Sequence, residues 1–588
     1  MDLYCCISLL LFLLGLVITL VLSRRFPGFS PIPGLIAATA AALCVLYWGV
    51  FFTDDSSLAA IPRNLVCGPI QTVRLFMLDS DDCFLHIYDR LSPAVRSWYM
   101  FFAPLLYLMA PILSAGMVLS LFRNLSAYER LLLHPFQQAF VFSELNGKSI
   151  LLAESIREKF PAALICFTRS LSGEEEGMLE LRSRAACLKA LLFKKDITSV
   201  HWSMGSKNRP LTFLAMTEEP ALCTQESLFL RKAYGGRASA SLYIFSSHTD
   251  SELLFSVNGA SGLRVRRIDP IRSLVNSTLY RQGEGLFSMA LPGENGKKQI
   301  SALILGLGRQ GSQMVKGLSW LGQMDGYDLS IHVFDWDPEA ERVFTASCPE
   351  LMSSDYNGTD VDGEARYKIT IHSGVSVDSP EFQHQLRDIG PVTYVLTALG
   401  SDRSNVEAAV QMRRLCLQNG SRPLIHCILF SGEETELLNQ ATDYRGHSYD
   451  LQFIGNLRDF YSYDTIFNNE LEDLALRRHL KWGDEASFWA YEFNYQSSVA
   501  SAIHAKMRQL CGIPGAGKPE NQVTKEEKLA LECLEHRRWN AYMRSEGYCY
   551  SGSPSKESRN DLAKLHNDLI PFRSLTKEEQ EKDFVGSI

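Results

Sequence analysis

The sequence predicts a multidomain protein with an N-terminal α-helical membrane segment, two α/β units and a mostly α-helical C-terminal domain. Three observations support this fold class. Three apolar runs of membrane length lie before residue 123, alternating strand-like and helix-like segments continue to about residue 465, and polar sequence with helical spacing follows. The 588 residues are enough for three to four domains.

The membrane segment is predicted from residues 3–22, 33–52 and 98–122, each about as long as the roughly 20 residues that cross a bilayer. Asp2 precedes the first run, so the basic start of a signal peptide is absent. Arginines follow the first and third runs, whereas the loop over residues 53–97 is acid-rich. The positive-inside rule therefore predicts a multi-pass protein of a bacterial inner membrane, with its N-terminus outside and residues from about 123 onward cytoplasmic.

Whether these spans form a pore is left open by the sequence. A span, a loop, a span and a cytosolic α/β domain is also the layout of ligand-gated potassium channels. However, residues 67–73 are not the carbonyl filter sequence of such a channel, so an anchor or signalling bundle is favoured. Cys67 and Cys83 would lie outside the cell, where a disulfide could form.

Composition excludes several classes of function. The net charge is −8 and there is no long basic run, which argues against binding nucleic acid through a broad basic face. The 14 cysteines include no CxxC pair, so no zinc site is expected. No nucleophile elbow, HExxH motif or catalytically spaced carboxylate pair is present, and we predict no catalytic residues.

The most informative motif is a GxGxxG turn that follows the apolar run 301–305. Gly306 permits a tight turn, Gly308 lets the backbone approach a pyrophosphate, and Gly311 lets the next helix pack on the strand. The N-terminus of that helix would offer N–H groups and a partial positive charge to a phosphate.

An acid closes the next predicted strand, residues 329–334. A carboxylate at Asp335 can accept both ribose hydroxyls, which favours NAD or a related adenine nucleotide over NADP. Strand, turn, helix and acid together predict a Rossmann fold; the alternative is the same fold with an empty crevice or another ligand. The predicted cofactor-binding residues are Gly306, Gly308, Arg309, Gln310, Gly311, Asp335, Asp337 and Thr397.

A degenerate copy of this unit precedes it. Residues 139–143, 148–160 and 163–168 read as strand, helix and strand, but two of the three glycines are missing and Arg169 stands where a ribose acid would. We therefore expect a structural role, as a dimer or tandem partner, for residues 136–290. Strands at 242–246 and 263–268 would complete the unit, and residues 291–299 would link it to the intact unit over residues 298–465.

A degenerate and an intact Rossmann unit in tandem after membrane spans resemble the RCK family (TrkA-N, KTN). The resemblance covers about residues 136–460 and is specific only at the turn 306–311 and Asp335. Domains of that family regulate potassium channels and transporters by binding nucleotides. The resemblance thus implies a homo-oligomer or a membrane transport partner.

The last part of the chain divides into a helical connector, residues 466–525, and a C-terminal domain, residues 526–588. The domain contains E-H-x-x-W from Glu535, a Gly-Tyr turn at residue 547 and K-x-H-x-x-L-x-P-F from Lys564. These features resemble the RyR domain, named from ryanodine receptors and also found in bacterial proteins. The resemblance implies a ligand-recognition patch, with solvated or capping roles as the alternative for each residue: Glu535, His536, Arg538, Trp539, Tyr548, Lys564 and His566.

Three functions follow as hypotheses. The first is a membrane-anchored cytosolic nucleotide sensor that regulates ion flux, potassium being one candidate, through its own spans or those of a partner. The second is a nucleotide-activated membrane effector of a bacterial defence system. The third is an NAD(P)-dependent oxidoreductase, which would need a substrate domain with an acid or base at the nicotinamide.

Overall fold

The computed structural model describes most of the chain, and its ranges are residues 1–25, 31–77, 79, 83–121, 123–169, 176–203, 206, 208–247, 262–293, 296–358, 367–430, 438, 440–467 and 469–583. The chain divides into two compact units, Met1–His134 and Pro135–Ile588. Each unit has a hydrophobic core of its own.

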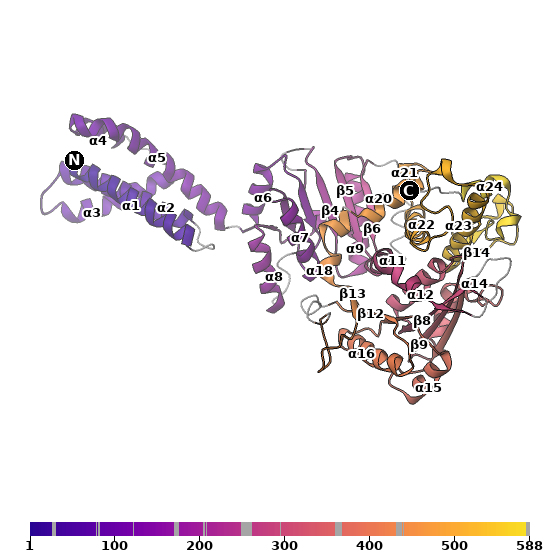
Figure 1. The fold of residues 1–588 in the computed structure, drawn as a ribbon. Coiled ribbons are helices and arrows are strands. Elements are labelled where there is room, and N and C mark those ends of the chain that lie inside the picture. Colours follow the sequence, from indigo (N-terminus) through magenta and orange to yellow (C-terminus); the bar gives the residue numbers. More distant parts are fainter. Residues whose placement is uncertain are drawn as a thin grey trace. The chain divides into compact units, whose positions relative to one another are not determined.

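The first unit is helical, and three of its helices suit a membrane. Its helices are α1 (Asp2–Arg25), α2 (Pro31–Asp54), α3 (Ile61–Phe76), α4 (Cys83–Asp89), α5 (Pro93–Leu121) and α6 (Arg123–Leu133), labelled in Figure 1. Asp2–Val21, Gly34–Asp54 and Pro93–Gly116 are long and apolar enough to cross a bilayer, which confirms three candidate spans. The third begins earlier than predicted because proline suits the first position of a helix; the predicted end, Phe122, lies outside the described residues.

Small residues bring α1 and α2 close together. A Cβ placed on Gly15 would lie 2.4 Å from the Cβ of Ala38. The hydroxyl of Ser8 donates a hydrogen bond of 2.7 Å to the carbonyl of Ala42. Such close approach and interhelical hydrogen bonding are the usual means by which membrane helices associate. Cys67 carries a free thiol, so the disulfide considered between it and Cys83 is not formed.

The second unit begins with a sheet of six parallel strands in the order β3-β2-β1-β4-β5-β6. The strands are β1 (Ala139–Phe142), β2 (Leu164–Phe167), β3 (Leu191–Leu192), β4 (Leu211–Ala215), β5 (Ala240–Phe245) and β6 (Arg264–Ile268). The helices between and after them are α7 (Gly147–Lys159), α8 (Glu176–Cys187), α9 (Pro220–Tyr234) and α11 (Pro270–Ser288). The four predicted strands are present, and β4 is an additional, fully buried one.

The next sheet repeats this strand order as β10-β9-β8-β11-β12-β13, all parallel. Its strands are β8 (Lys298–Leu305), β9 (Tyr327–Asp335), β10 (Tyr367–Ser373), β11 (Tyr394–Thr397), β12 (Leu424–Ile428) and β13 (Leu451–Ile454). Its helices are α12 (Arg309–Leu321), α13 (Ala340–Ser347), α14 (Pro349–Met352), α15 (Pro380–Ile389) and α16 (Asp402–Gln418). The predicted linker is partly a hairpin, because β7 (Leu291–Pro292) pairs antiparallel with the start of β8.

In both sheets the chain order reverses beside the first strand. Successive strands run outward on one side of β8 to β9 and β10, and the chain then returns to β11 on its other side. Loops at the carboxyl ends of the two strands at such a reversal diverge and leave a crevice, which is where α/β sheets usually bind ligands. The turn after β8 therefore lies at the switch point of the second sheet.

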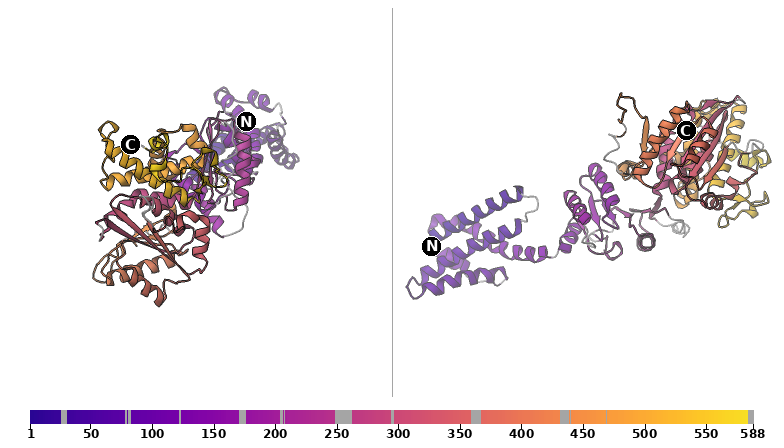
Figure 2. Two further views of the ribbon diagram at one scale, coloured as in Figure 1. Left: turned by 90° about the vertical axis from the view of Figure 1, so that its right-hand side faces the viewer. Right: turned by 90° about the horizontal axis from the view of Figure 1, so that it is seen from below.

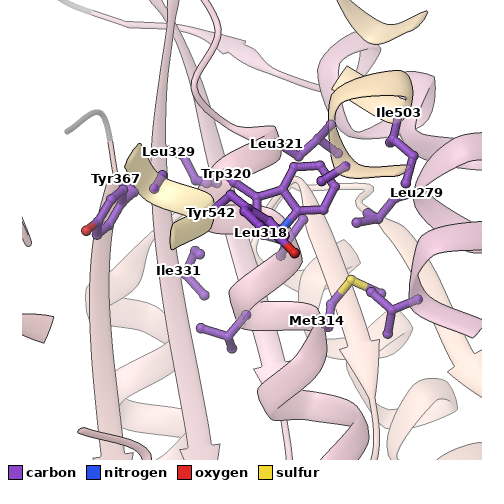
Figure 3. Packing of buried hydrophobic residues seen from close by; sticks show 14 of the residues in the cluster. Leu279, Met314, Leu318, Trp320, Leu321, Leu329, Ile331, Tyr367, Ile503 and Tyr542 are labelled. Carbon is purple, nitrogen blue, oxygen red and sulfur yellow. The ribbon is translucent and has the colours of Figure 1, made fainter. Parts of the chain in front are cut away.

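The C-terminal region is mostly helical; its first two helices pack in the core of the first sheet, and those from residue 470 onward share the core of the second sheet. Its elements are α18 (Leu457–Phe460), α19 (Tyr463–Phe467), α20 (Glu470–His479), α21 (Glu485–Ala490), α22 (Glu492–Leu510), α23 (Lys525–Ser545), α24 (Lys577–Lys582) and the short parallel pair β14 (Cys549–Tyr550) and β15 (Leu565–His566). In Figure 2 the last helices, coloured yellow, lie against the second sheet. Ile503 of α22 and Tyr542 of α23 pack among Trp320 and Leu321 of α12 (Figure 3).

Buried histidines predict how stability depends on pH. His426, which is 2% exposed in β12, lies in the core as expected; its Nδ1 is 3.0 Å from the Tyr394 hydroxyl. Burial lowers the pKa of His426 to about 4, and that of His566 to about 4 as well. In the unfolded chain a histidine pKa is about 6.5, so the unfolded state binds more protons between those values.

The part of the folding stability that depends on neutral His426 and His566 is fully present above about pH 6.5 and is lost as the pH falls toward 4. We expect the urea midpoint of the purified chain to be lower at pH 5 than at pH 7. His426→Gln should reduce that difference, whereas His384→Gln on the exposed face of α15 should not. An equal or higher midpoint at pH 5 would contradict this reading.

Candidate functional site

The turn between β8 and α12 contains two glycines that cannot carry a side chain. Gly306 has φ of +94°, and a Cβ there would lie 2.4 Å from the carbonyl oxygen of Ala398. A Cβ on Gly311 would lie 1.8 Å from the carbonyl oxygen of Gly306. Both distances are far below van der Waals contact, so the tight turn and the close approach of helix to strand require glycine.

Gly308 differs because the space beside it is open. It is the N-cap residue of α12, no side chain caps the helix there, and no described atom beyond its chain neighbours lies within 4 Å of a Cβ built on it. In the first hydrogen bond of the helix, the N–H of Ser312 donates to the Gly308 carbonyl at 2.9 Å. The N–H groups of the residues before Ser312 therefore have no acceptor within the helix. Together with the helix dipole they favour an anion at this end.

The corresponding turn of the first sheet is closed by the chain's own side chains. Oδ1 of Asn146 accepts N–H groups of Lys148 and Ser149 at 3.1 and 2.9 Å, which caps α7. At the place of the predicted ribose acid, Arg169 forms an ion pair of 2.8 Å with the buried carboxylate of Glu226. Groups that could meet a phosphate and a ribose are thus already engaged in the first sheet.

Asp335 stands at the end of β9, half-buried and next to the glycine turn. Its Oδ2 accepts the N–H of Leu307 at 2.6 Å, and its Oδ1 accepts the N–H of Asp337 at 2.8 Å. Each carboxylate oxygen has a further lone pair, so Asp335 can still accept ribose hydroxyls. Asp337 is exposed, and Trp336 between the two acids is 76% exposed, which leaves an aromatic face beside the candidate ribose position.

The remaining predicted residues of this site differ in their exposure to solvent. Arg309 is exposed, and its Nη1 donates to the Ser247 hydroxyl at 3.2 Å, just after β5. It also lines a cavity of about 240 Å³ with Lys148, so the glycine turn lies beside the carboxyl edge of the first sheet. Gln310 is half-buried, whereas Thr397 is fully buried in β11.

A second candidate site lies in the C-terminal region. A cavity of about 600 Å³ is lined by five of the seven residues predicted there, namely Glu535, His536, Arg538, Trp539 and His566. Of the other two, Tyr548 is buried in the core, and exposed Lys564 donates from Nζ to the Glu546 carbonyl at 2.7 Å. Neither lines this cavity.

His536 is fixed on the cavity wall by both ring nitrogens. Its Nε2 is 2.8 Å from the carbonyl oxygen of Ile570, and its Nδ1 is 3.0 Å from a carboxylate oxygen of Asp583. Burial raises the pKa of Asp583, which the hydrogen bond and charge of His536 oppose. Only 1% of His536 is exposed, so the side chain acts as a rigid part of the wall.

Several residues of these two sites are not marked by any motif in the sequence. Trp336 lies directly after the predicted ribose acid Asp335. An aromatic residue in a predicted loop beside that acid was the feature from which Trp336 could have been predicted. Arg478 of α20 and Arg508 of α22 join Arg538 beside Glu535, and no local motif marks them. No model of a known protein family matches the sequence, and a search of the curated proteins finds no match.

Proposed function

We propose that the chain is a membrane-anchored nucleotide sensor. NAD or a related adenine nucleotide binds with its phosphates at the N-terminus of α12 and its ribose at Asp335, and binding regulates ion flux or the state of the membrane. One observation carries the proposal. The helix after the glycine turn is uncapped and open at Gly308, whereas the matching helix of the first sheet is capped by Asn146.

The architecture supports the same proposal. The strand order, counted within each sheet as 3-2-1-4-5-6, is that of a Rossmann fold, and the glycine turn lies at its switch point. Two such units after apolar helices agree with an RCK-like arrangement, in which the first unit is structural. The RyR-like C-terminal region would then be a second ligand module, and the apolar helices would hold the N-terminus outside and the α/β units in the cytoplasm.

A ligand screen by thermal shift tests this function on the full chain purified in detergent. NAD, NADH, ATP, ADP-ribose and cyclic dinucleotides are compared, and at least one is expected to raise Tm. A ligand at one hundred times its Kd stabilises the protein by about 2.7 kcal/mol. Gly308→Trp fills the open space at the helix end and should abolish the shift.

The matched control is Gly147→Trp, at the first residue of α7, where a Cβ also meets no described neighbour within 4 Å. This variant should keep the shift, because its turn is already capped. If no nucleotide stabilises the wild type, or if the shift survives Gly308→Trp, the proposed site is wrong.

A further inference from the structure

The second cavity has a buried floor with an excess of positive charge. Glu535 of α23 is 3% exposed, and three guanidinium groups surround it. Nη2 of Arg538 lies 2.8 Å from its Oε1, and Nη2 of Arg508 and Arg478 lie 3.3 and 4.0 Å from its Oε2. Each of the three arginines is at most 5% exposed.

One carboxylate therefore lies beside three guanidinium groups that are almost fully buried. His504 adds no charge that compensates the cations, because burial lowers its pKa well below the usual value. The carboxyl group of Asp583, which lines the same cavity, also interacts with Arg538. Burial lowers the pKa of Arg478 to about 9, and Glu535 opposes that change, so the arginine remains charged at neutral pH. Unpaired buried charges are among the most costly features that a folded protein can contain.

The surplus N–H groups are on the arginines that line the cavity. Nε and Nη1 of Arg538 and Nη2 of Arg478 are buried and have no hydrogen-bond partner among the described residues. The Nε of Arg478 is satisfied, since it donates to the Ser501 hydroxyl at 2.9 Å, and that hydroxyl donates to Glu535. The cluster thus holds its geometry, while these buried guanidinium nitrogens have no acceptor among the described residues.

The rest of the wall sets the size and shape of a ligand. The volume of about 600 Å³ is in the range of small-molecule sites. Trp539, Trp482 and Phe493 supply aromatic surface, and Glu578 and Glu581 lie at the outer end. The exposed lining also includes Lys481, Arg559 and Lys582, so the cavity has a cationic floor, an aromatic middle and a rim of mixed charge.

We propose that this cavity binds a small molecule with a phosphate group, which Arg478 and Arg538 hold, and with a ring that lies against the tryptophans. This inference rests on the proposed function, in which the C-terminal region is a second ligand module. It names the chemical class of that ligand and includes α20 in the module. A phosphate dianion supplies negative charge to guanidinium groups that Glu535 does not fully neutralise, and its oxygens accept guanidinium N–H groups.

Helix α20 connects this site to the first sheet. At its start, Glu472 forms a buried ion pair of 2.8 Å with Arg266 of β6, and near its end Arg478 reaches the cavity. A phosphate bound by Arg478 would change the charge at one end of a ten-residue helix whose other end is fixed to that sheet. Occupancy of the cavity can thus bias the position of α20 relative to the α/β units.

Calorimetric titration of the full chain in detergent with AMP, inorganic phosphate and uncharged adenosine tests the proposal. The wild type should bind AMP and phosphate saturably, and adenosine should bind at least tenfold more weakly than AMP. Arg478→Met and Arg538→Met should each weaken AMP binding at least tenfold. Arg573→Gln, an exposed arginine of the same region outside the cavity lining, should leave it unchanged.

Two further readouts separate this site from the glycine turn and from a folding defect. AMP binding that is lost in Gly308→Trp but kept in Arg478→Met would overturn this inference and support the nucleotide turn. Binding that survives Gly308→Trp but not Arg478→Met supports the cavity whether or not the turn binds a nucleotide. Without ligand, Arg478→Met should melt no lower than the wild type, since it removes a surplus charge; no saturable binding of any probe to the wild type would also overturn the proposal.

Discussion

Replacing Glu535 with alanine is expected to lower the free energy of unfolding by about 3–5 kcal/mol, the usual cost of removing one partner from a buried ion cluster. The substitution leaves Arg478, Arg508 and Arg538 in the core without a carboxylate. The neighbouring guanidinium groups also hold the pKa of Glu535 below its usual range, against the effect of burial. Urea denaturation of the purified chain, followed by tryptophan fluorescence, measures the loss.

The control for this prediction is Glu578→Ala at the exposed end of the same cavity. The side chain of Glu578 is 75% exposed, and changes at such positions usually stay within about 0.5 kcal/mol. The carboxylate of Glu535 adds stability above its unfolded-state pKa of about 4.3, and that stability is lost as the pH falls through its lower folded value. Equal effects of the two substitutions would mean that the arginine cluster does not depend on Glu535.

The substitution Gly311→Ala is expected to have a similarly large effect, about 3 kcal/mol or more. The new Cβ would lie 1.8 Å from the Gly306 carbonyl oxygen, and that oxygen belongs to the turn backbone, which cannot rotate away as a side chain can. Relief requires α12 to move off β8, and α12 is part of the largest core of the second unit. Denaturation in urea and loss of nucleotide binding are the measurements.

Gly308→Ala makes the same chemical change three residues earlier, where the Cβ meets open space. Its cost should be about 1 kcal/mol or less, the difference between alanine and glycine at an N-cap. If both variants unfold at the same urea concentration, the close approach of α12 to β8 does not need glycine and the turn geometry described above is wrong.

Local features of the sequence were sufficient to predict much of the fold. The apolar run of β8, the three glycines and the acid at the end of β9 lie within about 40 residues, and each is a local sign of the strand, the turn or the candidate ribose contact. The lengths of the apolar runs in α1, α2 and α5 were likewise sufficient to predict the three candidate membrane spans. Strand β4 was missed because a run of four apolar residues and one threonine is too short for its periodicity to distinguish a strand from a helix.

The two candidate sites differ in how much the sequence could reveal. The glycine turn is a contiguous motif, so its residues were predictable one by one. The arginine cluster is assembled from α20, α22 and α23 by packing, and Arg478 lies 57 positions before Glu535 without a shared motif. Thr397 was predicted to line the site because it ends a strand, but its side chain is buried. The position of a residue at a strand end does not show which way its side chain points.

Photoaffinity labelling can show whether a nucleotide lies on the glycine turn. The full chain is irradiated with azido-adenine analogues of ATP and NAD, and the labelled peptides are identified by mass spectrometry. We expect saturable labelling in peptides that carry the turn 306–311 or the residues around Trp336. Unlabelled nucleotide should prevent this labelling, and Gly308→Trp should abolish it. Saturable labelling confined to peptides of the C-terminal cavity, or no saturable labelling of the wild type, would contradict nucleotide binding at the turn.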